Sequence, residues 1–109
     1  MITGIDRDEI IEYTSKFDKG EDKTIFLLGI LDNRTKMTLP MGDKVELEMM
    51  STIVKKGLKG IKGLKLKGEK KDITVIDDKV IDSLPIRVIG ELAEEIVKIN
   101  FLSEDDSKN

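Results

Sequence analysis

Eight lysines gather in residues 55–71, where a single acidic residue, Glu69, accompanies them. Such a concentration of positive charge is suited to nucleic-acid phosphates or to an acidic protein surface. Lysine offers a point charge and lacks the planar fork with which arginine reads bases, and no aromatic residue is interleaved for base stacking. Nucleic acid is therefore the less favoured ligand. The candidate basic contact residues are Lys55, Lys56, Lys59, Lys62, Lys65 and Lys67, and Lys70 and Lys71 complete the run.

Glycines punctuate the same segment, with Gly57, Gly60 and Gly63 recurring at every third position. This spacing is neither the phosphate-binding loop of nucleotide hydrolases nor the dinucleotide fingerprint. Repeated glycine disfavours a continuous helix, so we predict a basic loop over residues 59–72, with a short strand at residues 64–66. A solvated loop that balances acidic flanks is the favoured interpretation, and an acidic protein partner or nucleic acid stays open.

Acidic residues form three clusters that could in principle bind Mg²⁺ or transfer protons. None has the spacing of a helix–loop–helix calcium site, and acids before a helix complement its dipole. We therefore expect caps and solvated turns, and no metal. The clusters are Asp6, Asp8, Glu9 and Glu12; then Asp18, Glu21 and Asp22; then Asp77, Asp78 and Asp82.

The chain has no cysteine and no histidine, which excludes a thiol nucleophile and every catalytic triad that uses histidine as its base. No Gly-x-Ser-x-Gly motif surrounds any serine. The sequence predicts a protein that is not an enzyme and needs no cofactor.

A broad apolar face is predicted on a helix over residues 43–58, with Asp43 as N-cap and Glu46 closing a capping box. Methionine suits adaptable contacts with partners, so this face is a candidate protein-binding or homo-oligomer surface. The alternative, that packing on the sheet uses all of this area, stays open. The candidate apolar contact residues are Met49, Met50, Ile53, Val54 and Leu58.

Alternating residues predict strands at 10–17 and 24–31 that pair as an antiparallel hairpin, and a short third strand at 34–39. The hairpin region thus covers residues 1–40. Further along, we expect a short strand at 73–76, a helical turn at 79–84 capped by the acids before it, and a helix at 85–100 whose Glu91 faces water. An acidic tail at 103–109 follows.

These elements predict one α+β domain over residues 1–109, a small antiparallel sheet packed by two main amphipathic helices. Of the 109 residues, 39% are hydrophobic and 38% charged, and the net charge is −3. We find no signal peptide and no stretch of membrane-spanning length, so the expectation is a cytoplasmic protein without a membrane partner.

Six segments carry a further signal: GIDRDE at 4–9, EYTSKFDKGEDKTIF at 12–26, IVKKGLKG at 53–60, IDSLP at 81–85, ELAEEI at 91–96 and NFLSED at 100–105. In this order they resemble small accessory proteins of tailed bacteriophages and prophages. The resemblance implies a chaperone-like tail or virion assembly factor that contacts a phage structural or host protein in the host cytoplasm or the virion. A structural virion component, such as a connector or lattice protein, and a nucleic-acid or host-protein binder using the lysines are the alternatives.

Overall fold

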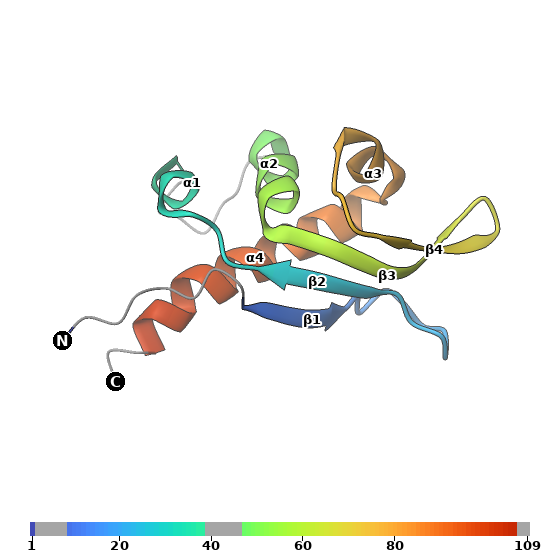
Figure 1. Ribbon diagram of the computed structural model, residues 1–109, viewed down its shortest axis with the longest axis horizontal. Helices are drawn as coiled ribbons and strands as arrows, with labels where there is room; N and C mark the ends of the chain where they lie inside the picture. The colour runs from blue at the N-terminus through green and yellow to red at the C-terminus, as the bar shows by residue number, and fades with distance from the viewer. Residues whose placement is uncertain (2–8, 39–46, 107–109) are drawn as a thin grey trace.

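The computed structural model describes residues 1, 9–38 and 47–106, and these residues form an α+β fold (Figure 1). The fold class that the sequence predicts is therefore confirmed. In chain order, the described elements are β1 (Ile10–Thr14), β2 (Ile25–Gly29), α1 (Asn33–Thr38), α2 (Leu47–Gly57), β3 (Leu58–Leu66), β4 (Glu69–Ile73), α3 (Asp78–Ser83) and α4 (Ile86–Asp106).

The sheet is antiparallel throughout, and its described strands lie in the order β1-β2-β3-β4. β1 and β2 form the predicted hairpin, with Ile10 opposite Gly29 and Thr14 opposite Ile25. Because consecutive strands are neighbours, β1 and β4 are the two edges of the sheet.

The predicted basic loop at 59–72 is wrong, because this segment forms the β3–β4 hairpin. Lys67 and Gly68 make its tight turn with φ of 51° and 83°, the two positive values of a type I′ turn. Leu58 and Ile61 are buried while Lys59 and Lys62 are exposed, so the lysines occupy the solvent side of a strand. The pairing of β3 with β4 shifts its register between Ile61 and Leu64.

The predicted strand at 34–39 is also wrong, because α1 occupies this place. Asp32 starts the helix: its Oδ1 accepts a hydrogen bond from the Thr35 amide at 2.7 Å, and its carbonyl accepts one from the Lys36 amide. This N-cap outweighs a weak alternation of residue types. Residue 39 lies outside the described residues.

The other helices lie near their predicted positions. α2 falls within 43–58, although Asp43 and Glu46 lie outside the described residues. Asp77 caps α3 by accepting from the Val80 amide at 3.0 Å. α4 begins after Pro85 as predicted but continues to Asp106, so the predicted acidic tail is helical up to there and 107–109 lie outside the described residues.

The hydrophobic core lies between the sheet and the helices, with α4 behind the sheet in the view of Figure 1. α2 approaches α4 closely at Gly57, where a Cβ would lie 2.5 Å from Cγ2 of Ile96. None of the helices in the described ranges combines the length and the hydrophobicity that crossing a bilayer requires. Fully buried core side chains include Leu28, Ile53, Val54, Leu92 and Ile96.

Candidate functional site

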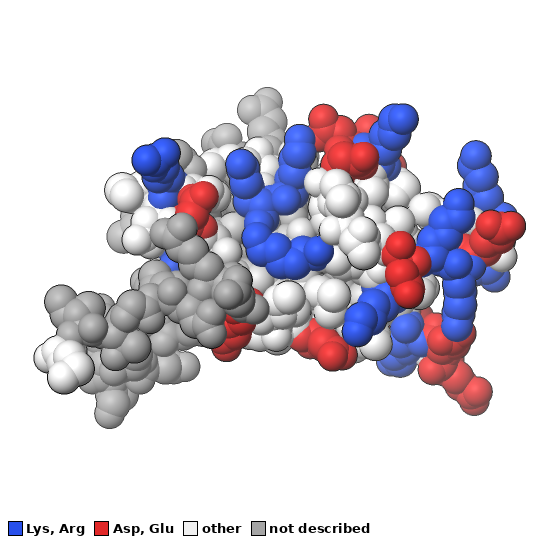
Figure 2. Space-filling model, in the orientation of Figure 1, with Lys and Arg blue, Asp and Glu red and all other residues white. Residues whose placement is uncertain are grey.

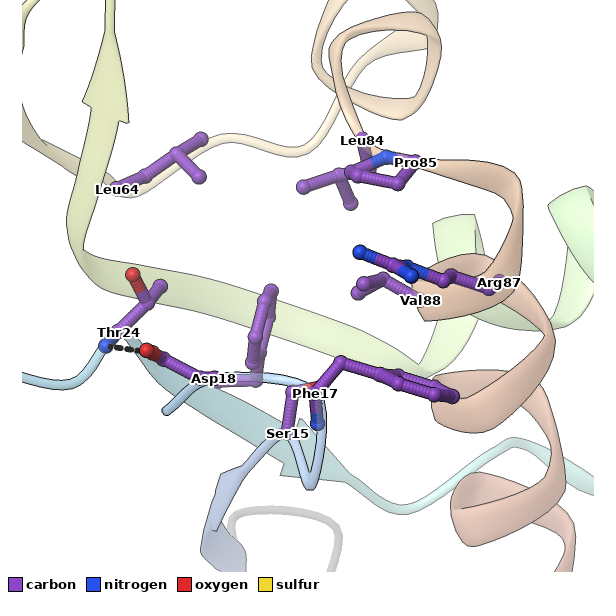
Figure 3. Close-up of a pocket in the computed structure, with 10 residues that line it drawn as sticks. Ser15, Phe17, Asp18, Thr24, Leu64, Leu84, Pro85, Arg87 and Val88 are labelled. Atoms are coloured by element: carbon purple, nitrogen blue, oxygen red, sulfur yellow. Dashed lines mark hydrogen bonds between the residues drawn. The ribbon is translucent and has the colours of Figure 1, made fainter. Parts of the chain in front are cut away.

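A pocket of about 210 Å³ opens where the β1–β2 turn meets β3 and the start of α4, and we call it the Arg87 pocket (Figure 3). Pro85 comes directly before α4, and its carbonyl accepts hydrogen bonds from the Val88 and Ile89 amides, so the Leu84-Pro85 step places Arg87 and Val88 in the first turn of the helix. Apolar groups supply most of its wall. It is lined by Ser15, Phe17, Asp18, Thr24, Phe26, Leu64, Leu84, Pro85, Arg87 and Val88.

Arg87 and Phe17 form one side of the pocket (Figure 3). The Arg87 Cζ lies 5.0 Å from the centroid of the Phe17 ring, within the range of a cation–π contact. The Phe17 side chain is 42% exposed, which is unusual for one of only four aromatic residues in the chain. A guanidinium held on an exposed ring therefore borders an apolar hollow.

The side chain of Asp18, on the other side of the pocket, forms hydrogen bonds within the turn that carries Phe17. Its Oδ2 accepts a hydrogen bond from the Thr24 amide at 2.9 Å, and its Oδ1 accepts one from the Gly20 amide at 3.4 Å. These bonds fix the polar stretch between β1 and β2 that the sequence predicts as a turn. Asp18 thus has a structural role.

Behind the pocket, the buried carboxylate of Glu91 joins α4 to the end of β1. It accepts hydrogen bonds from the Ser15 hydroxyl at 2.5 Å, the Tyr13 hydroxyl at 2.7 Å and the Lys16 amide at 2.9 Å. Glu91 is 7% exposed, so the prediction that it faces water is wrong. A carboxylate at the helix–sheet boundary is tolerated there because three donors replace its water.

This network sets the charge states of its members. Burial by itself raises the pKa of Glu91, but the hydrogen bonds from Ser15, Tyr13 and the Lys16 amide lower the pKa by more, so it lies below its usual value. Burial and the bond to Glu91 raise the pKa of the Tyr13 phenol. A carboxylate with a lowered pKa is a weak base, whereas activation of the Ser15 hydroxyl would need a stronger one. The ionised Glu91 carboxylate therefore joins α4 to the end of β1 through three hydrogen bonds.

The predicted apolar contact residues do not form one exposed surface. Ile53, Val54 and Leu58 are at most 2% exposed, so their burial in the core contradicts the prediction that they contact a partner. The apolar face of α2 packs against α4 and β3 and is therefore not available to a partner. Met49 and Met50 are partly buried at the margin of the core.

The predicted basic contact residues are all exposed, but they do not form one continuous patch. Figure 2 shows basic side chains in separate groups with acidic side chains among them. Lys55 pairs with Asp78 at 2.9 Å, Lys70 pairs with Asp22, and the Lys59 Nζ donates to the carbonyl of Lys56. Within the described ranges, no ion pair engages Lys62, Lys65 or Lys67, and nothing here tests whether these lysines bind a ligand. The six predicted residues are Lys55, Lys56, Lys59, Lys62, Lys65 and Lys67.

Sequence reasoning missed the pocket because its wall is assembled from distant segments. Phe17 appeared only as one position of an alternating strand, and Arg87 carried no motif. The one local signal was Leu84-Pro85 before an amphipathic helix. Within the part of the chain that the structure describes, no group of three or more acidic, cysteine or histidine residues could hold a metal ion.

Comparison with known proteins found no family model that matches the chain, and no curated protein or solved structure with significant similarity.

Proposed function

We propose that this chain is a protein-binding domain that takes one apolar side chain of a partner polypeptide into the Arg87 pocket. The observation that carries the proposal is an apolar hollow of about 210 Å³ bordered by an exposed aromatic ring. Exposed aromatic and arginine side chains are enriched where proteins bind one another.

The size of the pocket supports a side chain as its occupant. Pockets for drug-sized molecules and cofactors measure roughly 300–1,000 Å³, so the Arg87 pocket is too small for most of them. An engineered apolar cavity of about 150 Å³ accommodates benzene. A volume of about 210 Å³ therefore matches one leucine- or phenylalanine-sized group.

Exposed apolar side chains on the edge strand support a polypeptide as the ligand. Ile10 and Ile11 of β1 are 52% and 36% exposed, and β1 leads directly into the turn that carries Phe17. An edge strand of this composition is a typical place for another chain to associate. The narrower role of a phage tail or virion assembly factor rests on the sequence resemblance alone.

Selection from a random displayed-peptide library tests the proposal. We expect enriched peptides to share an apolar residue and to bind the purified protein with micromolar affinity. Val88→Phe fills the pocket and should abolish their binding, whereas Ile86→Phe adds the same ring at a 69% exposed site outside the pocket and should not.

A second variant guards against misfolding of Val88→Phe. Phe17→Ala removes a half-exposed ring and its contact with Arg87. It should weaken binding about tenfold, equivalent to about 1.4 kcal/mol, and lower the free energy of unfolding by only about 1 kcal/mol. Failure of the library to yield any peptide sensitive to Val88→Phe or Phe17→Ala would overturn the proposal.

A further inference from the structure

The Arg87 guanidinium lies against an aromatic ring and has no acidic partner among the residues that the structure describes. It lies over the Phe17 ring at 5.0 Å, and no carboxylate of the described residues forms an ion pair with it. The cation–π contact uses the face of the guanidinium and leaves N–H groups at its edge free to donate. Arginine in this state is suited to bind a carboxylate with two parallel hydrogen bonds.

The acidic residue of the pocket does not compete for this cation. Both carboxylate oxygens of Asp18 accept backbone hydrogen bonds inside the β1–β2 turn. In Figure 3, Asp18 lies beside Thr24, and Arg87 lies across the pocket from them. The pocket therefore combines an apolar interior with one available positive group.

The position of Arg87 restricts where a ligand carboxylate can be. Arg87 is exposed and forms part of the pocket wall with Val88 and Pro85, so a carboxylate bound to it lies at the rim of the volume of about 210 Å³. In an extended segment, the side chains next to an apolar residue point to the opposite face and cannot enter the same small pocket. A C-terminal residue carries its carboxylate and its side chain on the same Cα, so one residue supplies both the apolar group and the anion that this pocket fits.

We propose that the occupant of the Arg87 pocket is the C-terminal residue of a partner polypeptide, with its apolar side chain inside the pocket and its terminal carboxylate on Arg87. This inference rests on the proposed function and specifies the ligand of the same site. The ligand is therefore a free C-terminus. An internal segment that places an aspartate on Arg87 is the alternative, and the test below distinguishes the two.

Fluorescence polarisation with labelled six-residue peptides provides the test. The probes end in phenylalanine as the free acid, in phenylalanine as the amide, or in serine as the free acid. A fourth probe is amidated and has an internal aspartate next to phenylalanine. We expect the first probe to bind at least about tenfold more tightly than each of the others, the size of one good charged hydrogen-bonded contact.

Arg87→Gln should remove the preference for the acid over the amide while keeping the weaker binding of the apolar group. Arg34→Gln changes an exposed arginine of α1 outside the pocket and should keep the preference unchanged. A second readout is the methyl NMR signals of Leu64, Leu84 and Val88, which should shift with the first probe.

Three results would overturn the inference: equal binding of the acid and the amide, tighter binding of the internal-aspartate probe, or no binding of the phenylalanine acid. Each would leave the proposed function standing if library peptides still bind in a manner sensitive to Val88→Phe. If the library also yields no such peptide, both the inference and the proposed function fail.

Discussion

The Glu91 network gives the sharpest test of how the structure is held together. We consider Glu91→Gln, which keeps the size of the side chain and removes its charge. In the native protein three donors converge on this carboxylate, from Ser15, Tyr13 and the Lys16 amide. The variant retains one acceptor oxygen, and in place of the other it introduces an NH₂ group that faces hydrogen-bond donors.

The expected loss follows from the number of bonds. A hydrogen bond to a charged group contributes roughly 1.5–3 kcal/mol and a neutral one roughly 0.5–1.5 kcal/mol, a difference of about 1 kcal/mol for each bond. With the three donors named above, Glu91→Gln should lower the free energy of unfolding by about 3 kcal/mol. At a urea dependence of about 1.5 kcal/mol per molar, the unfolding midpoint falls by about 2 M.

Urea unfolding followed by circular dichroism measures this change, and its pH dependence tests the cause. Because the pKa of Glu91 is lowered in the folded state, its ionised form stabilises the fold above the unfolded pKa of about 4.3. That contribution is lost as pH falls through the lower folded value. The difference between the native protein and Glu91→Gln should therefore shrink below about pH 4.

Glu94→Gln is the matched control, because Glu94 lies one turn along α4 with a side chain 67% exposed. Because Glu94→Gln removes only the exposed pair with Lys98, and a pair of this kind contributes little to stability, its midpoint should fall by no more than about 0.3 M. A Glu91→Gln midpoint equal to the native one, or a difference that persists unchanged in acid, would refute this account of the network.

Four other predictions address single contacts. Gly57→Ala should lower the free energy of unfolding by about 1–3 kcal/mol, because the new Cβ would lie against the buried Ile96. Gly20→Ala is the control, because no atom lies nearer than 3.8 Å to its Cβ, and it should leave the stability unchanged. A Gly57→Ala protein that is more stable in thermal unfolding would contradict the packing. Asn100→Ala removes the acceptor of the Leu31 amide at 2.7 Å, so hydrogen exchange at that amide should accelerate, and unchanged protection would count against the bond. Lys67→Asn suits the positive φ of 51° and should raise the free energy of unfolding by about 0.5–1 kcal/mol; a loss of stability would argue against the type I′ turn. Tyr13 is the one tyrosine of the chain and no tryptophan is present, so tyrosinate absorbance should rise only at a pH well above 10, and Glu91→Gln should lower that pH.

The predictions that held are those governed by local chemistry. Alternating residue types and a polar turn identify β1 and β2, and Asp77 caps α3 through a bond within its own first turn. Pro85 marks the start of α4 for the same reason, since its fixed φ and missing amide suit a first helical turn.

The sequence by itself determined the α+β class, the first hairpin and the start of the last helix, because each depends on neighbours within a few residues. Only the tertiary structure decided that residues 58–73 pair as strands, since Leu58 and Ile61 are buried in the core while the lysines beside them stay exposed to solvent. It also decided that Glu91 is buried and that Phe17 meets Arg87, because the donors and the ring come from the other end of the chain. Contacts between residues seventy or more positions apart leave no local pattern, so the Arg87 pocket exists only in the folded chain.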